Sequence, residues 1–299
     1  MMKTVAAIHE HAVAARDVIW RGRFGPVATG IAALLLSLAT GHGARAEPAA
    51  KPEAAACNAA AFRPLVDVGH TAGKPGAKSA RGADEYDFNL RLARLIHQKL
   101  TDAGFSKAVL LITTEAPRLG LFKRVARANT LSADLFLSVH HDSVPDRFAE
   151  KWEYEGVKRE FSDRFRGHSL FVSRDNGDYK GSLLFGHLLG SELKTRGLKY
   201  TPHYVEKFMG SRQRQLVDAE VGVYRYDQLV VLKDSRMPAV LMEAGSIINR
   251  DEELLLGTPE HQALIADAAV EAIKSFCAAR AAPARTAAGP PSASPAKRR

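Results

Sequence analysis

The sequence predicts a single α/β domain: a twisted, mostly parallel sheet of about six strands with helices on both faces. Short runs of β-branched and apolar residues alternate with helical patterns along the middle of the chain, which favours strand–helix–strand units. The runs are also apolar almost throughout, as expected for strands that are covered on both faces.

Each expected element follows from a local pattern. The expected strands are, in chain order, 65–69, 109–112, 134–139, 169–173, 229–232 and 239–242. Helix 85–100 has Phe88, Leu92 and Ile96 on one face, which is the spacing of a helix packed on a sheet. Further helices are expected at 119–129, at 182–196, and from Thr258 onward, where a proline occupies the first turn.

The segment between the third and fourth strands carries a different pattern. Phe148, Trp152, Phe161 and Phe165 recur at near-helical spacing among many charged residues, which predicts an amphipathic helix within 144–166. Such a helix would leave the sheet close to the carboxyl end of the third strand. It would either pack its aromatic face on the body or form a lid over the ligand site.

The two ends of the chain differ in composition from this core. An apolar run at 30–40, too short to span a membrane, follows basic residues and precedes Ala44-Arg45-Ala46, which predicts a secretory signal peptide. A buried helix is the alternative interpretation of that run. The expected organisation is a signal peptide at 1–46, a linker at 47–60, the folded domain at 61–278 and a disordered basic tail at 279–299.

Export changes how the net charge of +9 is interpreted. Outside the cytoplasm, anionic wall polymers or membrane surfaces are better partners for a basic protein than nucleic acid. The chain also lacks the interleaved basic and aromatic residues that single-stranded nucleic acid requires, so no nucleic-acid partner is expected. No cysteine stands at the expected cleavage point, so no stable membrane anchor is expected either.

The chain has two cysteines, Cys57 and Cys277, and they lie near the two ends of the segment that is expected to fold. In an oxidising compartment, an even pair at such places favours a disulfide that clasps the termini. Two unpaired thiols are the alternative.

Side chains that can bind a metal follow three separate strands. His70 comes directly after the first, His140 and His141 end the third, and Glu243 ends the last. Ligands of open α/β sheets gather at the carboxyl ends of the strands, so these residues should meet at one edge. Buried polar groups are costly unless they are paired or bind a metal.

Glu85 adds a carboxylate to this edge, because it shares the helix face of Phe88 that packs on the sheet. Two histidines and one carboxylate form a hydrolytic zinc set that leaves a fourth position open for water. Glu85 could instead serve only the helix dipole. Side chains alternate across a strand, so His140 and His141 point to opposite faces, and periodicity does not decide between them.

At these residues the sequence resembles the zinc-dependent N-acetylmuramoyl-L-alanine amidases, which cut an amide bond in bacterial peptidoglycan. The resemblance covers residues 65–275, with an unfamiliar stretch around 145–167. It rests on Val66–Gly73 with Gly76, Gly82 and Glu85–Leu90, on Arg124–Asn129 with Ala133–Asp134 and Leu137–His140, and on Leu232 with Pro238–Asn249. In two departures, Thr71 stands where the family usually has glycine, and Ser246 replaces the usual aromatic residue. Neither departure removes a ligand.

The resemblance implies that the domain at 61–278 is the amidase catalytic domain. It implies that His70, Glu85 and His140 bind Zn²⁺ and that Glu243 is the catalytic carboxylate. It therefore selects His140 over His141 as the ligand. Further candidates for contact with the ligands or the substrate are Asp67, Asn89 and His141.

The expected substrate is peptidoglycan, the expected location is the periplasm or cell envelope, and a protein activator is a further candidate partner. Two rival functions remain open at this point. One is a zinc peptidase that cuts within the stem peptide, and the other is a non-catalytic wall-binding regulator. The complete set of His70, Glu85, His140 and Glu243 argues against the regulator.

Overall fold

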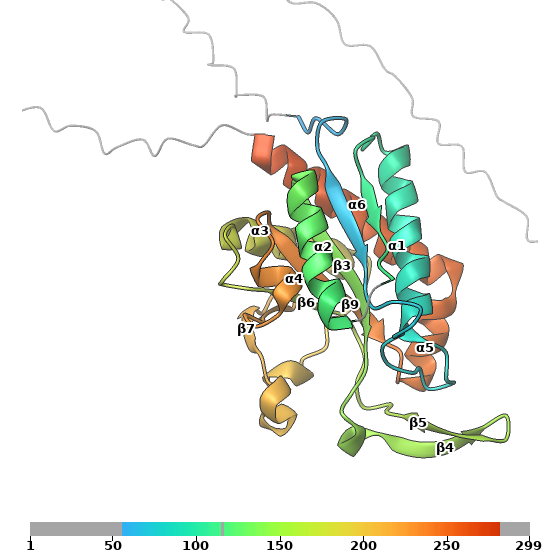
Figure 1. The fold of residues 1–299 in the computed structure, drawn as a ribbon. Coiled ribbons are helices and arrows are strands. Elements are labelled where there is room, and N and C mark those ends of the chain that lie inside the picture. Colours follow the sequence, from blue (N-terminus) through green and yellow to red (C-terminus); the bar gives the residue numbers. More distant parts are fainter. Residues whose placement is uncertain (1–55, 115–116, 282–299) are drawn as a thin grey trace, which may run out of the picture. The chain divides into compact units, whose positions relative to one another are not determined.

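A seven-stranded sheet forms the centre of the computed structural model, which describes residues 56–114 and 117–281 (Figure 1). The expected signal peptide, the linker up to residue 55 and the tail beyond residue 281 lie outside the described residues. Residues 279–281 were expected in the tail but belong to the last helix.

The order of the strands is β2-β1-β3-β9-β6-β8-β7. The four parallel neighbours at one side are β2 (Val109–Leu111), β1 (Pro64–Val68), β3 (Leu135–Asp142) and β9 (Ala239–Ser246). The other three are β6 (Ser169–Val172), which runs antiparallel to β9, then β8 (Val223–Arg225) and β7 (Gln215–Asp218). The prediction of a mostly parallel sheet in an α/β domain is confirmed, with one strand more than expected.

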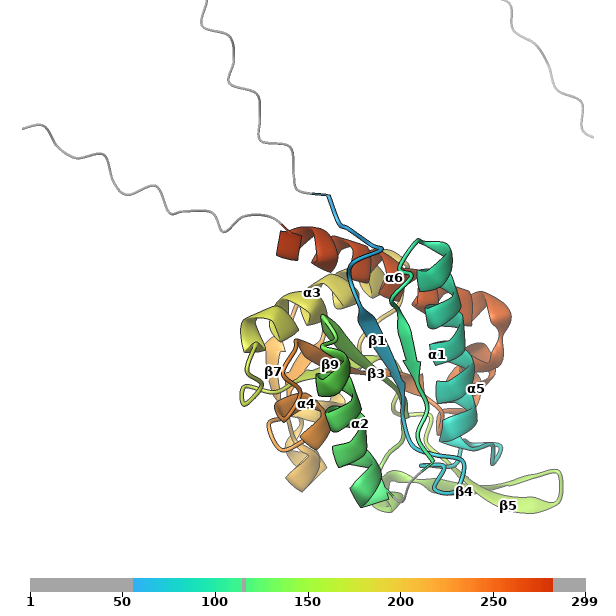
Figure 2. The ribbon, with the colours of Figure 1, turned by 45° about the horizontal axis from the view of Figure 1, so that its top comes forward.

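Helices cover both faces of this sheet (Figures 1 and 2). The first core lies under α1 (Glu85–Asp102), α3 (Tyr179–Thr195) and α6 (Pro259–Ala281). The second lies under α2 (Pro117–Leu131) and α4 (Val230–Lys233). The remaining helical segments are η1 (Asp146–Phe148), η2 (His203–Val205), η3 (Lys207–Arg212) and α5 (Arg250–Gly257). Among the described residues, no helix is both long and apolar enough to cross a membrane.

Alternation along β3 sorts its side chains between the two faces. Leu135, Leu137 and Val139 belong to the core under α1, α3 and α6, whereas Phe136 belongs to the core under α2 and α4. By the same alternation, His140 belongs to the α2 side and His141 to the α1 side.

The strand expected at 229–232 is wrong, because Val230–Lys233 forms the short helix α4. A run of four apolar residues does not distinguish a strand from one buried helical turn. The strand in this part of the chain is β8, which precedes α4, and the sequence pattern did not reveal it.

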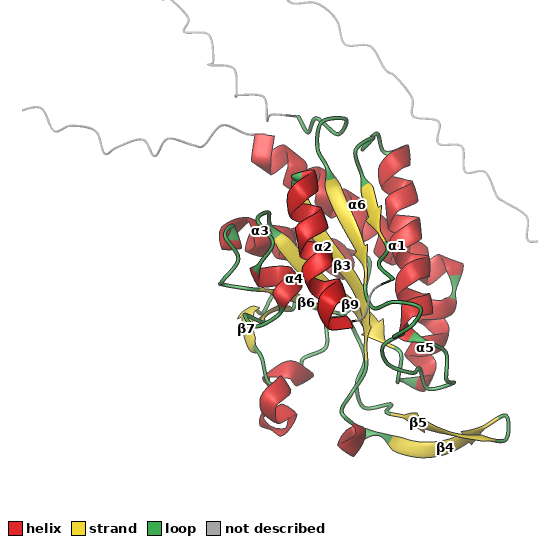
Figure 3. Cartoon of the chain, viewed as in Figure 1, coloured by secondary structure: helices red, strands yellow, loops and turns green. Residues whose placement is uncertain are grey.

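The amphipathic helix expected within 144–166 is also wrong, because the segment forms an antiparallel hairpin of β4 (Glu150–Tyr154) and β5 (Val157–Phe161) (Figure 3). Glu155 and Gly156 connect the strands with φ values of 51° and 73°, the geometry of a two-residue type I′ turn. Trp152 and Tyr154 are two residues apart in β4 and therefore lie on the same face of the hairpin. The helix was predicted because the spacing of the aromatic residues from Phe148 to Phe165 is also close to a helical period.

The structure joins Cys57 to Cys277 by a disulfide that closes a loop with a sequence separation of 220 residues. The bond ties the segment before β1 to α6. It therefore links the two ends of the described domain.

We expect the double variant Cys57→Ser, Cys277→Ser to lose up to about 5 kcal/mol of unfolding free energy, because an open chain has far more unfolded conformations. Urea unfolding of both proteins, with non-reduced peptide mapping of the wild type, measures this loss. Two free thiols in the wild type, or equal midpoints for both proteins, would contradict it.

Candidate metal centre and active-site cavity

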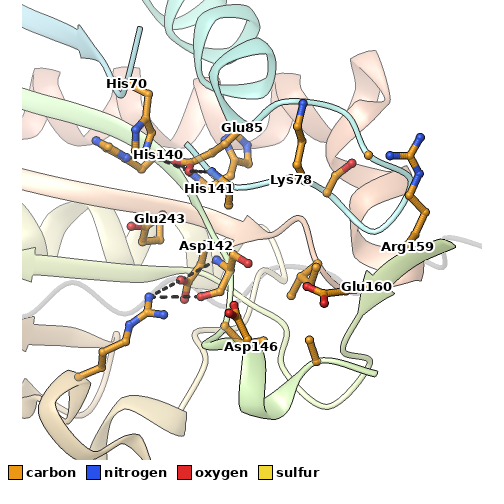
Figure 4. A pocket seen from close by; sticks show the side chains of 18 of the residues that line it. His70, Lys78, Glu85, His140, His141, Asp142, Asp146, Arg159, Glu160 and Glu243 are labelled. Atoms are coloured by element: carbon orange, nitrogen blue, oxygen red, sulfur yellow. Dashed lines mark hydrogen bonds and ion pairs between the residues drawn. The ribbon is translucent and has the colours of Figure 1, made fainter. Parts of the chain in front are cut away.

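Five of the residues that the sequence predicted for the site line one cavity of about 680 Å³ at the carboxyl ends of β1, β3 and β9: His70, Glu85, His140, His141 and Glu243 (Figure 4). The other two, Asp67 and Asn89, are buried behind it. His70 follows β1, His140 lies in β3, and Glu243 lies in β9 directly beside His140 in the strand register. Glu85 reaches the same place from the first residue of α1.

The Glu85 carboxylate lies between two imidazoles. Its Oε2 is 3.0 Å from His70 Nε2, and its Oε1 is 3.1 Å from His140 Nδ1. One donor atom from each of these residues lies within 4.8 Å of the others. Burial by itself would raise the pKa of Glu85, but the hydrogen bonds and charges of His140 and His70 outweigh it and lower that pKa. Two imidazoles and a carboxylate at such separations fit a divalent transition metal such as zinc.

Two glycines make room for these donors. A Cβ at Gly69 would overlap the ring of His140, and a Cβ at Gly76 would overlap both Glu85 Oε2 and the ring of His70. Gly76 also has a φ of 82°, which favours glycine independently. These are motif positions of the sequence, and the close approach explains why a side chain does not fit there.

His70 has left-handed backbone geometry, with a φ of 64°, which is uncommon for a residue with a side chain. Arg124 of α2 holds it from the buried side by donating from Nη2 to the His70 carbonyl oxygen. The same guanidinium donates from Nη1 to Asp67 Oδ2 at 3.1 Å, and Ser138 Oγ donates to that oxygen at 2.8 Å. Asp67 therefore acts on His70 through Arg124 rather than through direct contact.

Asn89 supports Glu85 from one turn further along α1. Its Nδ2 donates to Glu85 Oε1 at 3.1 Å and to the Gly69 carbonyl oxygen at 3.2 Å. Its Oδ1 lies 2.7 Å from His141 Nδ1, so the His141 ring is already engaged on the α1 side. Burial lowers the pKa of His141 to about 3, so that ring stays neutral.

Glu243 offers a carboxylate oxygen that is ready to accept a proton. Part of the residue is accessible from the cavity, but its Oε2 is shielded and has no hydrogen-bond partner among the described residues. Loss of hydration raises the pKa of Glu243 well above its usual value, and the negative charges of Asp142 and Glu85 add to this. The guanidinium of Arg212 opposes the shift.

Sequence reasoning missed the acidic neighbour of Glu243. Asp142 lies two residues after His140 in β3 and shares its side of the strand. Its Oδ2 accepts from Tyr204 Oη at 2.8 Å, and its Oδ1 lies 3.6 Å from Arg212 Nη2. Both partners come from the η2 and η3 segments, for which the sequence offered no periodic signal.

A family model of N-acetylmuramoyl-L-alanine amidases matches residues 65–275, which include all of these site residues. The chain belongs to this family. The amidase is 25% identical over 222 residues to a putative N-acetylmuramoyl-L-alanine amidase of Buchnera aphidicola. This alignment covers 71% of the present chain and 94% of the relative. It is also 25% identical over 224 residues to the N-acetylmuramoyl-L-alanine amidase AmiA of Escherichia coli, covering 71% and 75% of the two chains.

Solved structures show that the fold of the amidase is shared. The N-acetylmuramyl-L-alanine amidase Ami1 of Mycobacterium smegmatis superposes with a TM-score of 0.56 at 19% identity, covering 74% of this chain and 99% of the other. The catalytic domain of CwlV from Bacillus (Paenibacillus) polymyxa superposes with a TM-score of 0.52 at 23% identity, covering 72% and 97%.

We expect His140→Ala to abolish stoichiometric zinc binding, because it removes one of three donors around a single point. His141→Ala is the matched control: it should keep zinc and lose about 1–3 kcal/mol of stability, because Asn89 Oδ1 is left without its partner. Elemental analysis and thermal unfolding of the purified variants measure both effects. Zinc lost from the His141 variant and kept by the His140 variant would reverse the assignment.

Proposed function

We propose that this amidase is zinc-dependent and hydrolyses the bond between the lactyl group of N-acetylmuramic acid and the L-alanine of the stem peptide in peptidoglycan. The observation that carries the proposal is the donor set of His70, Glu85 and His140, with Glu243 beside it in one cavity. The family match supports the bond that is cut.

The chain's own residues divide the chemistry between them. Zinc, when bound, supplies a Lewis acid that polarises the amide carbonyl and favours deprotonation of the attacking water. Glu243 takes the proton of that water at a carboxylate oxygen and then delivers it to the leaving amine of L-alanine. Glu243 lines the cavity, and its shielded Oε2 has no hydrogen-bond partner among the described residues, which supports a carboxylate that the protein does not engage elsewhere. Asn89 and Arg124 keep Glu85 and His70 in place during the reaction.

The proposal also places the enzyme outside the cytoplasm, in the periplasm or cell envelope. The pattern at 1–46 is that of a signal peptide, and the Cys57–Cys277 disulfide suits an oxidising compartment. A protein activator remains a candidate partner, supported by the structure of the CwlD amidase of Clostridioides difficile in complex with the GerS lipoprotein.

The bond that is cut can be identified directly. We expect digestion of purified peptidoglycan to release peptides that begin with L-alanine and to leave unsubstituted muramic acid in intact glycan strands. Mass spectrometry of the products, with and without a chelator, tests both the bond and the metal. Fragments that are cut only within the stem peptide would identify the rival zinc peptidase.

We expect Glu243→Ala to lower kcat by about a hundredfold to ten-thousandfold, because it removes the general base. Its zinc content and melting temperature should stay near those of the wild type, since Glu243 is outside the donor set. Steady-state hydrolysis of a soluble muropeptide measures the change. A variant that keeps most of its turnover would place the base elsewhere.

A further inference from the structure

The β4–β5 hairpin forms the wall of the cavity that faces the metal donors. Lys158, Arg159 and Glu160 of β5 line the same cavity as His70 and Glu85 (Figure 4). The hairpin lies in the segment between β3 and β6, outside the motifs that carry the resemblance to the amidases.

The hairpin is held firmly on the body. Trp152 Nε1 donates to the Ala80 carbonyl oxygen at 3.1 Å, and the guanidinium of Arg250 lies 5.2 Å from the centre of the Trp152 ring. The same guanidinium lies 3.8 Å from the ring of Phe161 and forms an ion pair with Asp163. These contacts fix β5 at the rim, so a side chain on it has a defined position relative to the metal donors.

Among the four cationic residues that line the cavity, Arg159 combines partial burial with the lack of a counter-charge. Lys78 pairs with Asp84 at 2.5 Å, and Arg212 lies 3.6 Å from Asp142. Lys158 is exposed, so water screens its charge. Within the described part of the chain, Arg159 forms no ion pair, and its Nε is shielded from water without a hydrogen bond.

The position of the Arg159 guanidinium depends on Gly82. Gly82 has a φ of 90°, and a Cβ there would overlap the guanidinium, which therefore lies directly against the backbone of the loop before α1. A partly desolvated cation without a counter-charge is unfavourable. A carboxylate from a ligand in the cavity would restore the lost interaction, because a guanidinium binds carboxylates with two parallel hydrogen bonds.

We propose that Arg159 binds a free carboxylate of the peptidoglycan stem peptide beyond L-alanine, and so selects acidic stems over amidated ones. This inference rests on the proposed function of the same cavity. An extended peptide advances about 3.3–3.6 Å per residue, so a stem held at the metal donors places its second and third residues further along the cavity. These residues carry carboxylates that cells can leave free or convert to amides.

The test compares three soluble muropeptides: one with all stem carboxylates free, one amidated on the second residue and one amidated on the third. We expect the wild type to cleave the free form with a kcat/KM about 10- to 100-fold above one of the amidated forms. Arg159→Gln should lower kcat/KM on the free form to the amidated level, mainly by raising KM. It should leave cleavage of that amidated form unchanged.

Lys151→Gln is the matched control, since it removes a charge from the same hairpin at a residue that does not line the cavity. It should behave as the wild type. Equal cleavage of all three substrates by the wild type would overturn the inference without any variant. So would an equal loss on all three in a folded Arg159→Gln protein. A wild type that cleaves none of them at L-alanine would overturn the proposed function and this inference together.

Discussion

The parallel, in-register pairing of β1, β3 and β9 is the constraint on which the site depends. Val68 lies opposite Val139, and His140 lies opposite Glu243, so the three strands bring His70, His140 and Glu243 to neighbouring positions. Strands β3 and β9 continue to Asp142 and Ser246, and their register shifts only after His140. Parallel strands present their carboxyl ends at one edge, and each strand here carries, in or just after its last residues, a group that can bind a metal or a proton. A shift of one residue in any of these registers would turn that group to the other face of the sheet.

Two buried networks then convert this shared edge into a defined geometry. On the α2 side, the Asp67–Arg124 pair holds the left-handed backbone of His70. A strained backbone conformation costs about 1–3 kcal/mol, and the hydrogen bond from Arg124, whose guanidinium Asp67 holds in place, opposes its relaxation. On the α1 side, the Asn89 amide is hydrogen-bonded both to the Glu85 carboxylate and to the His141 ring. Together the two networks fix the orientation of the three donor side chains.

The cavity is electrically asymmetric. Its inner end gathers the carboxylates of Glu85, Asp142 and Glu243, which is consistent with a site for a cation and a general base. Its outer wall is a hairpin that presents Lys158, Arg159 and Glu160, and the Arg159 Nε is shielded without a hydrogen bond. An acidic peptide would be repelled by the inner carboxylates alone, and the positive charge of Arg159 on the outer wall would offset part of that repulsion.

The sequence by itself determined the α/β class, the central strands and the convergence of His70, Glu85, His140 and Glu243. These follow from periodicity and from the rule that parallel strands end together, both of which are local or topological. Even the sides of the sheet taken by His140 and His141 follow from alternation, although the choice of ligand needed the family resemblance.

Only the tertiary structure decided the features that depend on contacts between distant segments. The spacing of the aromatic residues in 148–165 is compatible with either an amphipathic helix or a β-hairpin. The turn at Glu155-Gly156 and the contacts of Trp152 with Ala80 and Arg250 favour the hairpin. The partners of Asp142 come from η2 and η3, short irregular segments without a periodic signal. The unpaired state of Arg159 is a property of what surrounds it in space, and a sequence does not record which charges lack a neighbour.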